Sequence, residues 1–293
     1  MTISDWKILA YVQLVYFALF AIAFTISVIQ ILGVRRNAIS TFDAGINKII
    51  KFYGLYFGLF ILCKIAGGAC AIVLYSLKTS NTNLYIATYV LDSVSISMLI
   101  KSFLPLIEFL IDKRTEVLDH QHDIHNPDFK KSPDYELPPK PKYHPFQVLT
   151  VLLLVGLILS IVASSSMDSS SASSYKTLLK ASAFIFLAVI LIITGILAFS
   201  VSFFSNSIYA HGYLLVSQAY ILLLAMPFML IRVIYSLLSA FSGANILSGH
   251  PSKYTLLLGD YKYYTFMAFA EECIISIILL FSMYYFSKNV SRF

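Results

Sequence analysis

The sequence predicts an all-α membrane protein, built as a bundle of seven transmembrane helices. Of its 293 residues, 58% are hydrophobic and only 12% are charged, and the mean hydropathy is +0.79. Soluble domains carry about 25% charged residues, and a soluble chain of this size could not hide so much apolar surface. Seven apolar stretches are also about as long as the roughly 20 residues that cross a bilayer. We therefore expect one transmembrane domain over residues 1–293, with lipid as its solvent.

The seven spans account for most of the chain. The first is too long for the roughly 7–15-residue apolar core of a signal peptide, so we expect it to remain as a signal anchor. The third is the least apolar, and its polar side chains require a face that looks into the bundle. The fourth is the shortest. The predicted spans cover residues 8–32, 52–77, 84–111, 146–163, 177–204, 213–241 and 264–287.

Basic residues near the span ends predict the orientation of the bundle. Twelve lysines and arginines lie on the side that carries the C-terminus, and six lie on the side of the N-terminus. Because cytosolic connections are enriched in basic residues, we expect the N-terminus outside and the C-terminus in the cytosol. This distribution also explains the net charge of +6, so we expect the lipid bilayer and no nucleic acid as a partner. The pattern fits the plasma membrane and an endomembrane equally well.

The connection over residues 112–145 is the one sizeable polar segment. It holds six prolines and few large apolar residues, so we expect a disordered cytosolic loop. Its proline-rich half favours a solvated linker, with a cytosolic protein partner as the alternative. His120, His122 and His125 form a loose tract with irregular spacing, and we expect no metal site there.

Charged residues lie well inside four of the spans, and most of them fall at one depth. Counted from the outer ends of their spans, Arg232 lies nine residues in, Asp92 eight, and Glu271 and Glu272 seven and eight. At a rise of 1.5 Å per residue, these four lie within about 3 Å of one level. Lys64 lies about 7 Å deeper, and its long side chain can reach toward Asp92.

An unpaired charge in a spanning helix costs about 2.5–3.5 kcal/mol, so Arg232 requires a carboxylate partner. We expect Glu272 to bind it bidentately, since neighbouring spans can bring a guanidinium and a carboxylate together. Glu271 points about 100° away from Glu272 around its helix. Pro227 is expected to kink its helix below this level and to open a cavity toward the outside.

Two interpretations of these five residues remain open. One is a structural set of ion pairs that fixes how the helices pack. The other is a polar pocket open to the outer face, which a small-molecule ligand would occupy. The pocket favours a receptor or sensor, with a transporter or lipid-handling protein as the alternative, and the ion pairs favour a non-catalytic scaffold. Lys101 and Glu108 form a second, inner set, for which snorkelling to the inner surface is the simpler interpretation.

The sequence shows no motif for catalysis or for cofactor binding. The spans lack the histidines that an intramembrane zinc hydrolase requires. The last span has no lysine within 264–287 that could form a Schiff base with retinal, and no Gly-rich phosphate loop is present. We therefore expect a protein that is not an enzyme and that binds no cofactor.

Two neighbouring segments carry a resemblance to a known family. They are "MPFMLIRVIYSLLSAF" (226–241) and "YTFMAFAEECIISIILL" (264–280), which combine a Pro-x-x-x-x-Arg-x-x-Tyr element with a span that has an early glutamate. The chain resembles an uncharacterised family of fungal seven-span integral membrane proteins that contains a domain of unknown function. This resemblance implies the seven-span fold and no particular activity.

Overall fold

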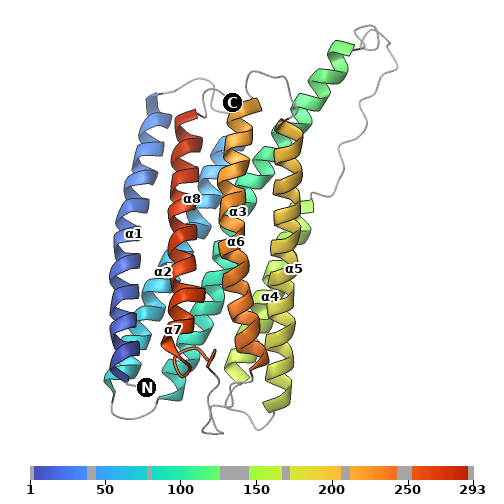
Figure 1. The fold of residues 1–293 in the computed structure, drawn as a ribbon. Helices are drawn as coiled ribbons and strands as arrows, with labels where there is room; N and C mark the ends of the chain where they lie inside the picture. Colours follow the sequence, from blue (N-terminus) through green and yellow to red (C-terminus); the bar gives the residue numbers. More distant parts are fainter. Residues whose placement is uncertain are drawn as a thin grey trace.

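The computed structural model of the chain is all-helical in the residues it describes. These are residues 3–37, 44–77, 81–125, 145–166, 172–205, 212–242 and 253–289. Within them, seven helical segments are long and apolar enough to cross a membrane, which confirms the predicted fold class (Figure 1). The predicted spans differ from these segments by only a few residues at each end, because hydrophobic length defines both.

The helices follow one another up and down the bundle. The seventh span consists of α7, a π-helical turn η4 and α8. The elements are α1 (Ile3–Asn37), α2 (Ala44–Ser76), α3 (Thr82–His125), α4 (Pro145–Ser165), α5 (Ala172–Ser205), α6 (Gly212–Phe241), α7 (Tyr261–Tyr264), η4 (Thr265–Phe269) and α8 (Ala270–Asn289).

Helix α3 lies at the centre of the bundle. Helices that follow each other in the chain pack against each other, and α8 closes the arrangement between α1 and α6. In addition to its neighbours α2 and α4, α3 contacts α5 and α6 (Figure 1). Of an 18-residue window in its transmembrane segment, 78% is buried, against 17% for the corresponding window in α1. The polar residues of the third span therefore face other helices, as the sequence predicted.

One predicted boundary is wrong. Helix α3 continues to His125, so residues 112–125 are helical and do not belong to a disordered loop. This stretch contains no glycine or proline, and the helix ends just before Asn126 and Pro127, where a proline disfavours helical backbone in the preceding residue. All six prolines of the connection lie at position 127 or later, outside this helix. Residues 126–144 lie outside the described part of the chain.

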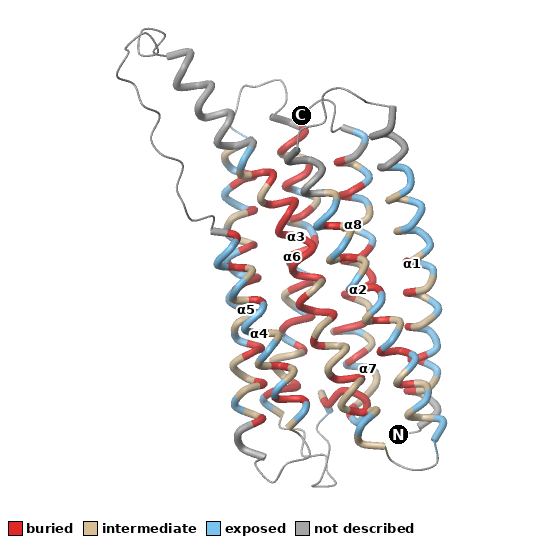
Figure 2. The backbone as a smooth tube through the Cα atoms, turned by 180° about the vertical axis from the view of Figure 1, so that it is seen from behind, coloured by how far each residue is buried: buried red, intermediate tan, exposed pale blue. Residues whose placement is uncertain are grey.

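Apolar side chains occupy both the interior and the outer surface of the bundle. Buried residues follow α3 and the inner faces of the other helices, while exposed residues lie on the outer faces (Figure 2). The exposed set includes large apolar side chains such as Ile8, Leu19 and Val151, which are about 60% exposed. Continuous apolar surface of this extent requires lipid contact.

Candidate functional site

Four charged side chains from four helices meet inside the bundle, and we call them the charged layer. They are Lys64 of α2, Asp92 of α3, Arg232 of α6 and Glu272 of α8. Asp92 is 16% exposed, and the other three are at most 1% exposed. All four lie nine to twelve residues from the span ends that share the end of the bundle where α1 begins. Their common depth follows from the constant rise of a helix.

Each cation of the charged layer contacts both carboxylates. The Nζ atom of Lys64 lies 2.6 Å from Oδ1 of Asp92 and 2.6 Å from Oε1 of Glu272. Arg232 places Nη2 2.7 Å from Oδ2 of Asp92 and Nε 2.6 Å from Oε1 of Glu272. Two positive and two negative charges therefore balance, which offsets much of the cost of burying each one.

The expected bidentate pair between Arg232 and Glu272 does not form. The guanidinium instead divides its donors among three groups, because Nη1 donates to Oγ of Ser236 at 2.8 Å while Nε and Nη2 reach different carboxylates. Lys64 shares Oε1 of Glu272 with Arg232, and Oε2 of Glu272 has no hydrogen-bond partner among the described residues. Ser236 was not predicted, although its position four residues after Arg232 on one helix face was a usable signal.

Glu271 is the one predicted site residue that stays outside the charged layer. It is 9% exposed, and its Oε2 atom has no hydrogen-bond partner in the described part of the chain. Adjacent residues on a helix point about 100° apart, so a helix that aims Glu272 at Arg232 aims Glu271 elsewhere. The two glutamates are thus unequal in their surroundings despite their adjacency in sequence.

A π-helical turn precedes Glu272 and sets its direction. Residues Thr265–Phe269 form this turn, and the N–H of Ala270 donates to the carbonyl of Thr265. A π turn holds one more residue than an α turn, so it rotates everything after it around the helix axis. Such turns occur frequently at functional sites. The sequence contains no signal that predicted it. By contrast, α6 runs as one helix through Pro227 to Phe241.

Residues 253–260 form a short segment between α6 and α7, which we call the cap loop. It lies at the end of the bundle where α1 begins (Figure 1). Leu257 has a φ of 65°, a left-handed conformation that is strained for a residue with a side chain. Gly259 is required by close packing, because a Cβ there would lie 2.6 Å from the carbonyl oxygen of Thr255 and nearer still to that of Lys253. The cap loop is therefore a tightly specified turn.

Three aromatic side chains from three helices hold the cap loop through its carbonyl groups. The indole of Trp6 donates to the carbonyl of Gly259 at 3.1 Å. The hydroxyl of Tyr75 donates to Leu257 at 2.6 Å, and that of Tyr85 donates to Leu256 at 3.1 Å. These side chains come from α1, α2 and α3, so the cap loop connects the first three helices to the last two.

Two small cavities flank the charged layer. One, of about 20 Å³, is bordered by Lys64, Asp92 and Tyr264. The other, of about 40 Å³, is bordered by Asp92, Arg232 and Ser236. Leu256 of the cap loop lines both. A water molecule needs about 10–15 Å³ of such space, so these cavities admit a few waters at most. They are much smaller than the open polar pocket that the sequence suggested.

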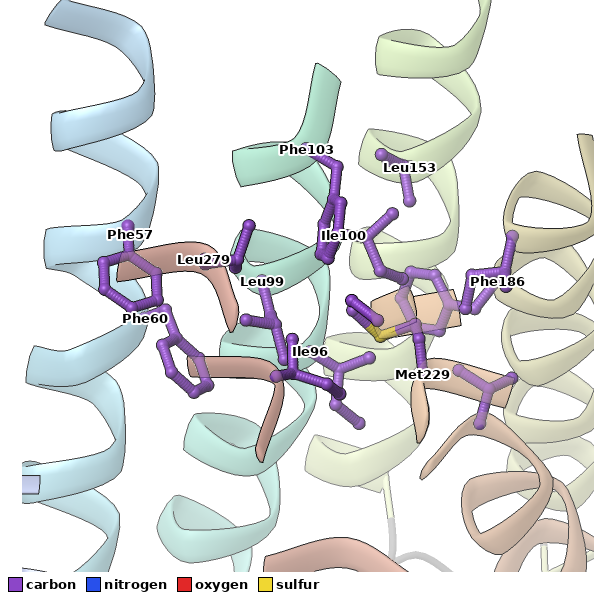
Figure 3. Close-up of a cluster of buried hydrophobic side chains, with 14 of the residues drawn as sticks. Phe57, Phe60, Ile96, Leu99, Ile100, Phe103, Leu153, Phe186, Met229 and Leu279 are labelled. Carbon is purple, nitrogen blue, oxygen red and sulfur yellow. The ribbon is translucent and has the colours of Figure 1, made fainter. Parts of the chain in front are cut away.

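An apolar cluster lies on the other side of the charged layer. Toward the end of the bundle opposite the cap loop, Leu99 follows Asp92 by seven residues and Leu279 follows Glu272 by seven. Each lies about 10 Å further along its helix. Figure 3 shows these residues with Phe60, Phe103 and Met229 in one packed group, all at most 1% exposed. Leu256 of the cap loop lines both small cavities, whereas Leu99, Leu279, Phe60, Phe103 and Met229 line neither of them.

The comparisons with known proteins place the chain in a family. A family model, Domain of unknown function (DUF7702), matches residues 136–288. This segment includes Arg232, Ser236 and Glu272, whereas Lys64 and Asp92 precede it. No curated protein and no solved structure matches the chain. Because the matched segment covers more than half of the 293 residues, the chain belongs to the DUF7702 family, whose domain has no known function.

Proposed function

We propose that the protein is a non-catalytic membrane receptor or sensor, and that a small charged solute acts on its charged layer from the cap-loop side. The observation that carries this proposal is the sharing of one buried network by α2, α3, α6 and α8. A solute that replaced one ion pair would weaken the contacts among four helices at once. Binding would thus change helix packing, which is what a sensor requires.

The position of Asp92 supports an approach from the cap loop. It is the most exposed member of the charged layer, and it borders both cavities. Leu256 of the cap loop lines both cavities, and its carbonyl is held by a hydrogen bond from the hydroxyl of Tyr85. In the proposed orientation this end faces the outside or the lumen, and residues 112–145 face the cytosol, where a partner protein would bind them.

The apolar cluster makes a receptor a better fit than a transporter. A solute that left the charged layer toward the far end would have to pass closely packed side chains such as Phe60, Leu99 and Phe103. Transport would require these side chains to separate, whereas a sensor requires only that the helices shift.

A structural clamp is the second candidate, and the size of the cavities favours it. The charged layer has no net charge, and each of its two cations already contacts both carboxylates. The cavities of 20 and 40 Å³ hold only water-sized molecules. In this case the four residues would specify how the helices pack without binding a solute.

A double variant separates the two candidates. Arg232→Leu with Glu272→Leu leaves Lys64 and Asp92 as a balanced pair, so we expect this variant to fold better than either single variant. The thermal unfolding of wild type and double variant, both in lipid nanodiscs, is measured against a panel of amino acids, carboxylates, polyamines and inorganic ions.

A sensor predicts that at least one compound raises the melting temperature of the wild type and leaves the double variant unchanged. At a concentration 100 times its dissociation constant, such a compound would stabilise the wild type by about 2.7 kcal/mol. If no compound distinguishes the two proteins, the receptor proposal is wrong and the clamp remains.

A further inference from the structure

A third and much larger cavity lies away from the charged layer. Its volume is about 490 Å³, against 20 and 40 Å³ beside the charged layer, and this is within the range of ligand pockets, about 300–1,000 Å³. Residues of α2, α3 and α4 line it, and α2 and α4 pack on α3 from either side. Lys101 lies nine residues beyond Asp92, about 13 Å toward the end where α8 finishes.

Lys101 brings a buried positive charge to this cavity. Its side chain is only 6% exposed, and its ammonium lies 6.0 Å from the centre of the Tyr56 ring. No carboxylate among the described residues pairs with it, in contrast to Lys64, which contacts two. Side chains on a helix lean toward its N-terminus, and α3 begins at the cap-loop end of the bundle. Lys101 therefore leans away from the opposite end, where α8 finishes, and does not snorkel to the membrane surface there.

The other charged residue of the cavity does not neutralise Lys101. Glu108 lies two helical turns further along α3, about 10.5 Å away along the axis, and it is engaged in another interaction. Glu108 lies only four residues before Asp112, where the third span ends. The cavity thus has a deep cationic end and a rim near the membrane surface.

The walls of the cavity are mostly apolar and open toward lipid. Phe52, Leu104, Phe146 and Val151 are among its lining residues. Phe52 and Val151 are 37% and 59% exposed, so the wall they form continues into the outer, lipid-facing surface of the bundle. A ligand that enters sideways from the bilayer would keep its apolar part in contact with these side chains throughout.

We propose that this cavity binds one anionic phospholipid, whose phosphate pairs with Lys101. A phosphate would supply the negative charge that no described carboxylate places beside Lys101, and basic pockets between transmembrane helices are known to hold such headgroups. An acyl chain would lie along Phe52 and Val151. The exposed side chain of Gln147 at the rim is a donor for the headgroup oxygens.

The test uses the full chain in nanodiscs of phosphatidylcholine that contain a small fraction of phosphatidylglycerol. Lipids that stay bound after transfer to detergent are counted by native mass spectrometry. We expect the wild type to retain phosphatidylglycerol, and Lys101→Gln to retain at least tenfold less. Lys51→Gln is the matched control. Lys51 is an exposed lysine of α2 next to Phe52, and it does not itself line the cavity.

A second variant keeps the proposal testable if Lys101→Gln fails to fold. Val151→Trp fills the mouth of the cavity and leaves Lys101 in place, so it should also lose the lipid. Val155→Trp, four residues later on the same exposed face and outside the cavity, should retain it.

Three results would overturn the proposal. The first is retention of phosphatidylglycerol by both Lys101→Gln and Val151→Trp at the wild-type level. The second is equal retention of phosphatidylcholine and phosphatidylglycerol by the wild type when both are supplied in equal amounts. The third is displacement of the lipid by millimolar inorganic phosphate, which would identify a site for a free anion.

Discussion

Removing the charge of Glu272 should destabilise the protein more than removing that of its neighbour Glu271. Glu272→Gln leaves Lys64 and Arg232 with Asp92 as their one carboxylate, so the charged layer gains a net charge of +1. Both cations are at most 1% exposed and lose a negative charge that lies 2.6 Å away. Breaking a buried ion pair from one side costs about 3–5 kcal/mol.

The charge balance can be restored in a second step. Lys64→Met combined with Glu272→Gln returns the charged layer to one cation and one anion, with Arg232 still 2.7 Å from Asp92. The double variant should therefore be more stable than the sum of the two single changes predicts, with a coupling energy of about 1–3 kcal/mol. The sign of the coupling follows from charge alone, whatever the exact positions of the side chains.

Glu271→Gln is the internal control, because it makes the same chemical change one residue earlier, outside the charged layer. Equilibrium unfolding in mixed micelles measures the free energy of unfolding for all four variants and the wild type. The reasoning is refuted if Glu272→Gln costs no more than Glu271→Gln. It is equally refuted if the effects of Lys64→Met and Glu272→Gln simply add.

Three further predictions concern the cap loop and the apolar cluster. Gly259→Ala should open the cap loop, since a Cβ would meet the carbonyl oxygen of Thr255 at 2.6 Å. Gly195→Ala in α5 is the control, because a Cβ there has open space, and it should be neutral or stabilise the protein by up to about 1 kcal/mol. Hydrogen exchange of the Leu256 and Leu257 amides should be faster in the first variant and unchanged in the second. Trp6→Phe removes the 3.1 Å hydrogen bond to Gly259 and should cost about 1 kcal/mol in unfolding experiments, and an unchanged stability would show that this bond contributes nothing. Phe103→Ala should cost about 3–5 kcal/mol, because the side chain is 1% exposed, and a smaller loss would mean that the apolar cluster collapses around the gap.

The helices and the depth of the charged residues were readable from local sequence. Hydrophobic length predicts each span, because a helix must satisfy its own backbone while it crosses lipid. Depth requires only the distance from a span end and the constant rise per residue. That is why Asp92, Arg232 and Glu272 could be expected at one level, with Lys64 deeper but able to reach Asp92, before their contacts were known.

Direction around each helix was not readable in the same way. Which carboxylate meets which donor of Arg232 depends on how four helices pack and on the π turn at Thr265–Phe269, which rotates Glu272. The same limit applies to the hydrogen bonds of Trp6 and Tyr75 with the cap loop, and to the cavity at Lys101. These contacts join residues far apart in the chain, whereas composition and spacing report on one segment at a time. Local sequence therefore specifies how deep each charge lies, and long-range packing specifies what it touches.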